Sequence, residues 1–129
     1  MRTLNILLIE RADLFRAERF QTKLPKGVSL RILANNFSND SYSADDASVK
    51  QIEAAIEQEA FDLIVIGNYQ GAGLIRARGV PDSMKAKTVI VWFKIDEKER
   101  AQYAAMGFNQ FTTRTKIHEF LLQLLGFTP

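Results

Sequence analysis

The residues best placed to do chemistry follow an apolar stretch in the middle of the chain. Leu63–Ile66 is a continuous, mostly β-branched run, which predicts a strand buried on both faces, as in the centre of a parallel sheet. The run ends at Gly67, and Asn68, Tyr69 and Gln70 follow. In open α/β folds, ligands bind at the carboxyl ends of such strands. None of these four residues is a carboxylate, a thiol or a histidine, so we expect no enzymatic activity.

Other reactive residue types are scarce. The chain has no cysteine, which excludes thiolate metal sites and a cysteine nucleophile. His118 is the only histidine and is expected at the surface, in the first turn of the last helix. A single histidine without cysteines makes a poor metal site, so we expect neither a metal nor a cofactor. Asp45 and Asp46 are interpreted as a helix cap and a solvated face rather than as catalytic acids.

A glycine-bearing turn could bind an anion. Gly67, Gly71 and Gly73 follow the strand and precede a short helix, and Arg76 and Arg78 are close in sequence. Backbone amides in such a turn can hold a phosphate. The spacing matches neither the phosphate-loop nor the dinucleotide-binding fingerprint, so ordinary turn geometry is the favoured interpretation.

Composition limits the function classes further. A chain of 129 residues with 47% hydrophobic content predicts one domain, spanning residues 1–129, with a substantial core. The net charge of +2 is too small to indicate nucleic-acid binding. No apolar run reaches the roughly 18–20 residues of a membrane span, and the start of the chain lacks the plan of a signal peptide. We therefore expect a cytoplasmic protein that binds neither nucleic acid nor membranes.

Strand-like and helix-like segments alternate along the chain. The expected strands are Leu4–Ile9, Val28–Ala34, Leu63–Ile66, Thr88–Phe93 and Phe108–Thr112. The first expected helix is Ala12–Leu24, and the second has the buried stripe Val49, Ile52, Ala55 and Ile56. A short helix is expected within Leu74–Gly79. The last two are Glu97–Met106, capped by Asp96 and ended by Gly107, and a helix capped by Thr115 and closed by Gly126. Asn35–Ser43 is expected to be a surface loop.

This alternation predicts an α/β fold. Five parallel strands joined by right-handed crossovers form a three-layer (βα)5 sandwich. Val28–Ala34 alternates apolar and polar residues, as an edge strand does, whereas the third strand is continuously apolar and the first is apolar except for Asn5. The pattern favours the flavodoxin-like strand order 2-1-3-4-5.

Several segments also resemble the receiver domain of bacterial response regulators. Ile6–Glu10 resembles that family's first strand and acidic corner, and Asp13–Arg16 the start of its first helix. Phe61–Ile66 resembles the family's third strand, and Ala104–Phe108 its alanine-glycine turn before the fifth strand. The resemblance covers nearly the whole chain and implies a receiver-like fold.

The resemblance also shows that the phosphorylation machinery is incomplete. Receivers phosphorylate an aspartate at the end of the third strand, and this position falls on Gly67, or on Asn68 if the register slips by one. The acidic pair that holds magnesium becomes Glu10 and Arg11, and a guanidinium repels the ion. The remaining positions are a bulky Phe93 in place of Thr or Ser, Arg114 in place of Lys, and Phe111 at the aromatic switch position.

These departures imply a degenerate, phosphorylation-independent pseudo-receiver. We expect it to signal by binding a protein partner or a second copy of itself, through the last two helices and the last strand. Tyr103, Phe108 and Phe111 are the candidate residues of that face, since aromatic residues are frequent interface hot spots. Glu10 is expected either to bind a ligand or to pair with a basic neighbour such as Arg114.

An alternative from a different class remains open. The chain could bind a small ligand, a nucleotide or a phosphate, through the glycine turn and the arginines Arg76, Arg78 or Arg114. A ligand that binds only the folded state would raise the melting temperature, which distinguishes this alternative from a pure interaction module.

Overall fold

The computed structural model describes residues 2–9, 12–34, 46–68 and 72–127. Its centre is a five-stranded, all-parallel sheet in the order β2-β1-β3-β4-β5. The strands are β1 (Arg2–Ile9), β2 (Val28–Ala34), β3 (Leu63–Gly67), β4 (Thr88–Trp92) and β5 (Gln110–Thr113). The fold is flavodoxin-like, and both the expected strand order and the edge position of β2 are confirmed.

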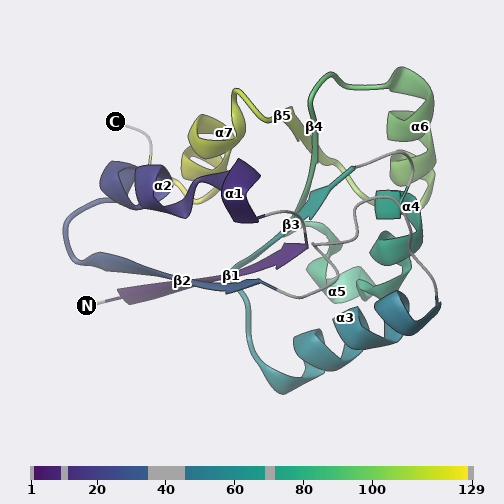
Figure 1. Cartoon of the computed structure of the whole chain (residues 1–129), viewed down its shortest axis with the longest axis horizontal. Coiled ribbons are helices and arrows are strands. Elements are labelled where there is room, and N and C mark those ends of the chain that lie inside the picture. Colours follow the sequence, from purple (N-terminus) through teal and green to yellow (C-terminus); the bar gives the residue numbers. More distant parts are fainter. Residues whose placement is uncertain (1, 10–11, 35–45, 69–71, 128–129) are drawn as a thin grey trace.

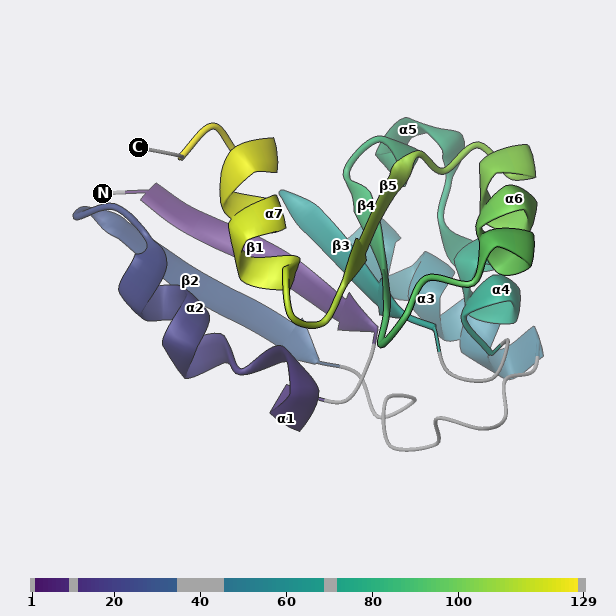
Figure 2. The ribbon, with the colours of Figure 1, turned by 90° about the horizontal axis from the view of Figure 1, so that it is seen from above.

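Helices cover both faces of the sheet (Figures 1 and 2). Side chains alternate along each strand, so Ile6 of β1 points to one layer and Leu7 to the other. The first layer holds α1 (Ala12–Phe15), α2 (Ala17–Lys23) and α7 (Ile117–Leu124). The second holds α3 (Asp46–Gln58), α4 (Ala72–Arg76), the 3-10 helix η2 (Ala77–Gly79) and α6 (Glu97–Ala105). Each face therefore has its own apolar core.

The expected single helix over Ala12–Leu24 is wrong, because the chain breaks at Arg16. The backbone of Arg16 is left-handed, with φ 55° and ψ 61°, and separates α1 from α2. On a regular helix, Phe15 and Phe20 would lie about 140° apart. The break lets both rings enter the same core, where they are fully buried and their centroids lie 5.7 Å apart.

The segment between β3 and β4 contains more helix than expected. Besides α4 and η2, a one-turn helix α5 (Asp82–Lys85) follows Pro81, and an ion pair of 2.9 Å joins its two ends. The expected break at residues 80–82 holds only for η2, because a proline is compatible with the start of a new helix. Within the described residues, none of the helices has both the length and the apolar character needed to cross a membrane.

The C-terminal elements follow the expected pattern with two differences. The side chain of Asp96 accepts a hydrogen bond from the Glu99 amide at 3.0 Å and caps α6, and Gly107 with φ 103° ends it, as expected. In contrast, β5 begins two residues later than expected. Thr115 does not cap α7 either: Lys116 holds the cap position, without a side-chain hydrogen bond.

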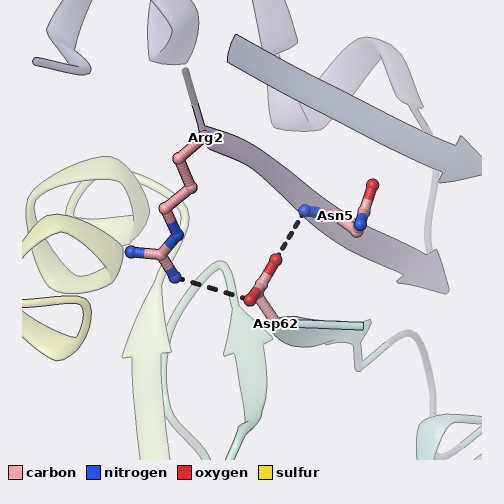
Figure 3. A network of polar contacts seen from close by, with 3 residues as sticks. All are labelled: Arg2, Asn5 and Asp62. Atoms are coloured by element: carbon pink, nitrogen blue, oxygen red, sulfur yellow. Dashed lines mark hydrogen bonds and ion pairs between the residues drawn. The ribbon is translucent and has the colours of Figure 1, made fainter. Parts of the chain in front are cut away.

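Asp62 joins the start of β3 to β1 (Figure 3). Its Oδ2 accepts a hydrogen bond from the Asn5 amide at 2.8 Å, and its own amide donates to the Asn5 carbonyl at 2.8 Å. Arg2 lies 3.5 Å from the other carboxylate oxygen. These contacts set the register of the two central strands, and this register determines which residues reach the carboxyl end of the sheet.

Candidate functional site

The tip of β3 is occupied by Gly67 and Asn68. Gly67 is the last residue of the strand, and the amide of Asn68 donates to the Val91 carbonyl at 2.8 Å, so the pairing with β4 continues one residue further. Asn68 is 9% exposed. Tyr69, Gln70 and Gly71, which we expected in this turn, lie outside the described residues, as do Glu10, Arg11 and the loop over residues 35–43.

Both the oxygen and the nitrogen of the Asn68 side-chain amide form hydrogen bonds with residues of α6. The hydroxyl of Tyr103 donates to Asn68 Oδ1 at 2.7 Å, and Asn68 Nδ2 donates to Glu99 Oε2 at 3.1 Å. Burial raises the pKa of Tyr103 well above its usual value, Glu99 adds to the rise, and Arg76 opposes it. The phenol therefore stays protonated and keeps its role as a donor. The tip of β3 is thus a polar clamp that holds α6 to the strand.

Gly73 allows α4 to lie directly against this clamp. A Cβ atom added at Gly73 would lie 2.3 Å from Tyr103 Oη, 3.1 Å from Asn68 Oδ1 and 3.2 Å from the Gly67 carbonyl. Real Cβ atoms do not approach other atoms as closely as the first distance, so any other residue at this position must displace the Tyr103 hydroxyl. A packing role explains this glycine without an anion in the turn.

The arginines named for anion binding do not lie together. Arg76 is only 2% exposed and belongs to the layer of α3, α4 and α6, whereas Arg78 is exposed on η2. Arg114 follows β5 and lines a hollow on the other face of the sheet. The three arginines therefore do not form one site, whereas an anion site of the glycine turn with one of them stays a prediction, since residues 69–71 lie outside the described part of the chain.

Phe93 lies elsewhere than expected. We expected its ring to fill the space of a phosphoryl group, but Phe93 follows the end of β4 and is 63% exposed. The guanidinium carbon of Arg114 lies 4.7 Å from the centroid of the Phe93 ring, a cation–π contact. Arg114 thus stacks on an aromatic ring at the surface. Its expected pairing with Glu10 falls on a residue outside the described part of the chain.

The expected aromatic interaction face is largely core. Tyr103 is 0% exposed and Phe108 only 1% exposed, and their rings pack edge to face with centroids 6.1 Å apart. Both were named as interface residues and neither can contact a partner. Phe111 is partly exposed, with the guanidinium of Arg100 5.9 Å from its ring centroid. Tyr103 and Phe108 therefore belong to the apolar core between the sheet and α6 rather than to a contact surface.

Sequence reasoning missed a basic hollow between α1, α2 and α7. Its volume is about 500 Å³. Phe15 and Ile117, both buried, form part of its lining, and Phe93 and Arg114 border it at the carboxyl end of the sheet. Figures 1 and 2 show α2 and α7 side by side over the same face of the sheet.

His118 lies inside this hollow and not on an open surface. Its Nε2 is 2.6 Å from the Phe15 carbonyl; since a carbonyl only accepts, Nε2 carries the proton and donates. Its ring packs against Phe15 and Phe20 with centroids 5.4 and 5.2 Å apart. Burial lowers the pKa of His118, the bond to Phe15 opposes this, and the nearby cations lower it further. The His118 imidazole is therefore predominantly neutral at pH 7.

Those cations are Arg16, which precedes α2, and Arg19 and Lys23 of α2, and all three line the hollow. The spacing of four residues places Arg19 and Lys23 on one side of α2. This spacing is visible in the sequence, but it acquires meaning only once α7 is known to lie opposite. Within the described part of the chain, none of the three forms an ion pair with a carboxylate.

Among the described residues, no three histidine, cysteine, aspartate or glutamate side chains come together in a way that could hold a metal ion. Comparison of the chain with protein-family models, with curated proteins and with solved structures found no match in any of the three. The functional interpretation therefore depends on the site geometry.

Proposed function

We propose that the chain is a receiver-like regulatory module that acts through protein–protein contact or self-association and is not phosphorylated. The observation that carries this proposal is the tip of β3, where Gly67 and Asn68 stand in place of a carboxylate. Neither side chain can form an acyl phosphate.

The chemistry of phosphoryl transfer supports this assignment. Transfer requires a nucleophile, a metal ion held by oxygen ligands, and donors for the phosphoryl oxygens. The amide of Asn68 is already bonded to Tyr103 and Glu99, so its polar atoms are committed to the fold. A phosphoryl group could bind there only by displacing these hydrogen bonds, and any buried polar group left unpaired would cost about 1–3 kcal/mol. The clamp therefore favours one permanent arrangement of α6.

The surface of α6 and β5 is the proposed contact region. β5 is the last strand of the sheet, and edge strands readily pair with another chain. On α6, Ala104 and Ala105 are exposed, and Arg100 of the same helix lies over the ring of the partly exposed Phe111. This region replaces the mostly buried aromatic face expected from the sequence.

A phosphodonor experiment tests the first half of the proposal. The protein is incubated with Mg²⁺ and acetyl phosphate, and its intact mass is measured. We expect no added phosphoryl group, and we expect the same sedimentation profile with and without the donor. A stoichiometric, hydroxylamine-labile phosphate would overturn the proposal.

A pair of substitutions tests the contact region. Ala104→Arg places a long charged side chain on the exposed face of α6, and Ala54→Arg makes the same change on the exposed face of α3. We expect concentration-dependent self-association, measured by analytical ultracentrifugation, to be weakened only by Ala104→Arg. Equal weakening by both substitutions would place the contact outside α6 and β5.

A further inference from the structure

The outer edge of β2 has no neighbouring strand among the described residues. β2 is the last strand on its side of the sheet, and α2 lies beside it (Figure 2). It is seven residues long, against four for β5 at the opposite edge. Natural edge strands are commonly short or bulged, or carry lysine or proline. β2 contains neither residue type, and its pairing with β1 is regular over its whole length, so its outer edge is suited to pair with another strand.

Alternate residues of β2 direct their backbone groups to this edge. The Gly27 carbonyl accepts a hydrogen bond from the Arg2 amide at 3.0 Å, so the backbone just before β2 faces β1. Successive residues of a strand direct their N–H and C=O groups to opposite sides. The backbone groups of residues 29, 31 and 33 therefore also face β1, whereas those of Leu30 and Ile32 face outward.

A groove lies between this edge and α2. Ala17, Glu18 and Gln21 of α2 and Leu30 and Ile32 of β2 line it, and its volume is about 370 Å³. We call it the edge groove. The two residues that present their backbone to the edge thus also present apolar side chains to the groove. When a peptide adds a strand to a sheet, backbone hydrogen bonds provide affinity and pockets for alternate side chains provide specificity, and the edge groove offers both.

Glu18 gives the edge groove a charge preference. This residue is exposed in the first turn of α2, and within the described part of the chain it forms no ion pair. A cationic side chain on the added strand would complement it. The β2 strand of a second copy cannot supply that cation, because its one charged residue, Arg31, projects from the opposite face of the sheet and pairs with Glu59. Charge complementarity therefore favours a different protein as the occupant.

We propose that the edge groove binds an extended segment of a partner protein, which adds a strand to β2 and places a cationic side chain beside Glu18. Apolar side chains at alternate positions of this segment pack on Leu30 and Ile32, and its backbone bonds to the outward N–H and C=O groups of the same two residues. The edge groove is separate from the contact region on α6 and β5, since β2 and β5 lie at opposite edges of the sheet. The two proposals can therefore fail independently.

A symmetric peptide tests this proposal. The peptide acetyl-Thr-Val-Thr-Lys-Thr-Val-Thr-amide reads the same from either end, so it can pair with β2 in both directions. In an extended conformation its valines and its lysine lie on one face. A matched peptide carries glutamate in place of the lysine. Amide hydrogen exchange of the full chain is followed by NMR spectroscopy with and without each peptide.

The exchange pattern along β2 should alternate. In the free protein, we expect the amides of Ser29 and Arg31, which bond to β1, to exchange slowly, and those of Leu30 and Ile32 to exchange faster. The lysine peptide, at about ten times its dissociation constant, should slow the exchange of Leu30 and Ile32 by roughly tenfold, because only the unbound fraction exchanges freely. The glutamate peptide should bind more weakly.

Two matched variants test the charge preference. Glu18→Gln should weaken binding of the lysine peptide by about twofold to fivefold, the range of an exposed ion pair, and should not weaken binding of the glutamate peptide. Glu57→Gln makes the same change on the exposed side of α3 and should leave both affinities unchanged. Thermal denaturation confirms that both variants are folded.

Three results would overturn the proposal. The first is unchanged exchange of the Leu30 and Ile32 amides with the lysine peptide at millimolar concentration. The second is slow exchange of these amides in the free protein: if it is independent of protein concentration, the chain itself covers the edge, and if it increases with concentration, a second copy occupies it. The third is equal affinity for the lysine and glutamate peptides, which would remove the contact with Glu18.

Discussion

Gly73→Ala is the most incisive test of the polar clamp. The new Cβ would lie 2.3 Å from Tyr103 Oη, so the hydroxyl must move by more than 1 Å, on the order of the gap to ordinary van der Waals contact. That displacement breaks the 2.7 Å bond to Asn68 and leaves the buried Tyr103 hydroxyl unpaired.

The cost follows from these contacts. An unpaired buried polar group costs about 1–3 kcal/mol, and overpacking of a dense core costs about 1–3 kcal/mol more. Alanine recovers about 1 kcal/mol of helix propensity relative to glycine. We therefore expect Gly73→Ala to lower the free energy of unfolding by about 1–5 kcal/mol, measured by urea denaturation with linear extrapolation.

A double-mutant cycle with Tyr103→Phe identifies the atom responsible. Phenylalanine removes the hydroxyl that lies closest to the new methyl group, and the remaining contacts of 3.1 and 3.2 Å need only small adjustments. We expect Gly73→Ala to cost much less in the Tyr103→Phe background, with a coupling energy of about 1–3 kcal/mol. Strictly additive effects of the two substitutions would refute the clamp as described.

Three further outcomes follow from the structure. Glycine adopts a left-handed backbone without strain, so Arg16→Gly should leave the free energy of unfolding, measured by thermal denaturation, unchanged or raise it by up to about 1 kcal/mol. Arg16→Ala keeps the strain and should not raise the free energy of unfolding. A clear loss of stability in Arg16→Gly but not in Arg16→Ala would contradict the strain. Asp62→Ala removes the acceptor of the Asn5 amide and should cost about 1–2 kcal/mol in urea denaturation, whereas loss of the exposed Arg2 contact in Arg2→Gln should cost under about 1 kcal/mol. Because burial lowers the pKa of His118 below its ordinary value of 6.5, the unfolded state binds the proton more readily, so stability should fall as pH drops below 6.5; His118→Gln should abolish this component of the pH dependence.

The sheet could be predicted from the sequence because its signal is local. Predominantly apolar runs mark β1, β3 and β4, and the alternation in Val28–Ala34 marks the edge strand. The caps at Asp96 and Gly107 were equally readable. These features depend on side chains within a few positions of one another, so no tertiary information is needed.

The site could not be predicted in the same way, because it is formed by residues that are far apart in the sequence and meet only in the folded structure. Tyr103 looked like an interface aromatic, yet only the packing of α6 against β3 shows that it is buried. The break at Arg16 brings Phe15 and Phe20 into the same core, and this packing overrides the regular helical pattern of the sequence. His118 became informative only when α7 was placed beside α2.

The end of β4 connects the two regions. Trp92 packs against Tyr103 with centroids 5.5 Å apart, and the next residue, Phe93, carries the guanidinium of Arg114. The Arg114 amide also donates to the Trp92 carbonyl at 2.9 Å. A continuous path of contacts therefore joins the clamp to the hollow.

A path of contacts transmits binding energy only if an element in it has two arrangements. Hydrogen bonds hold β4 to β3 on one side and to β5 on the other, and Trp92 is buried, so we expect no second arrangement of this strand end. The ¹H–¹³C chemical shifts of the His118 imidazole, which lies in the hollow, should accordingly be the same in Tyr103→Phe as in the unaltered protein. A clear shift of these signals would show that the strand end moves and that the clamp and the hollow are coupled.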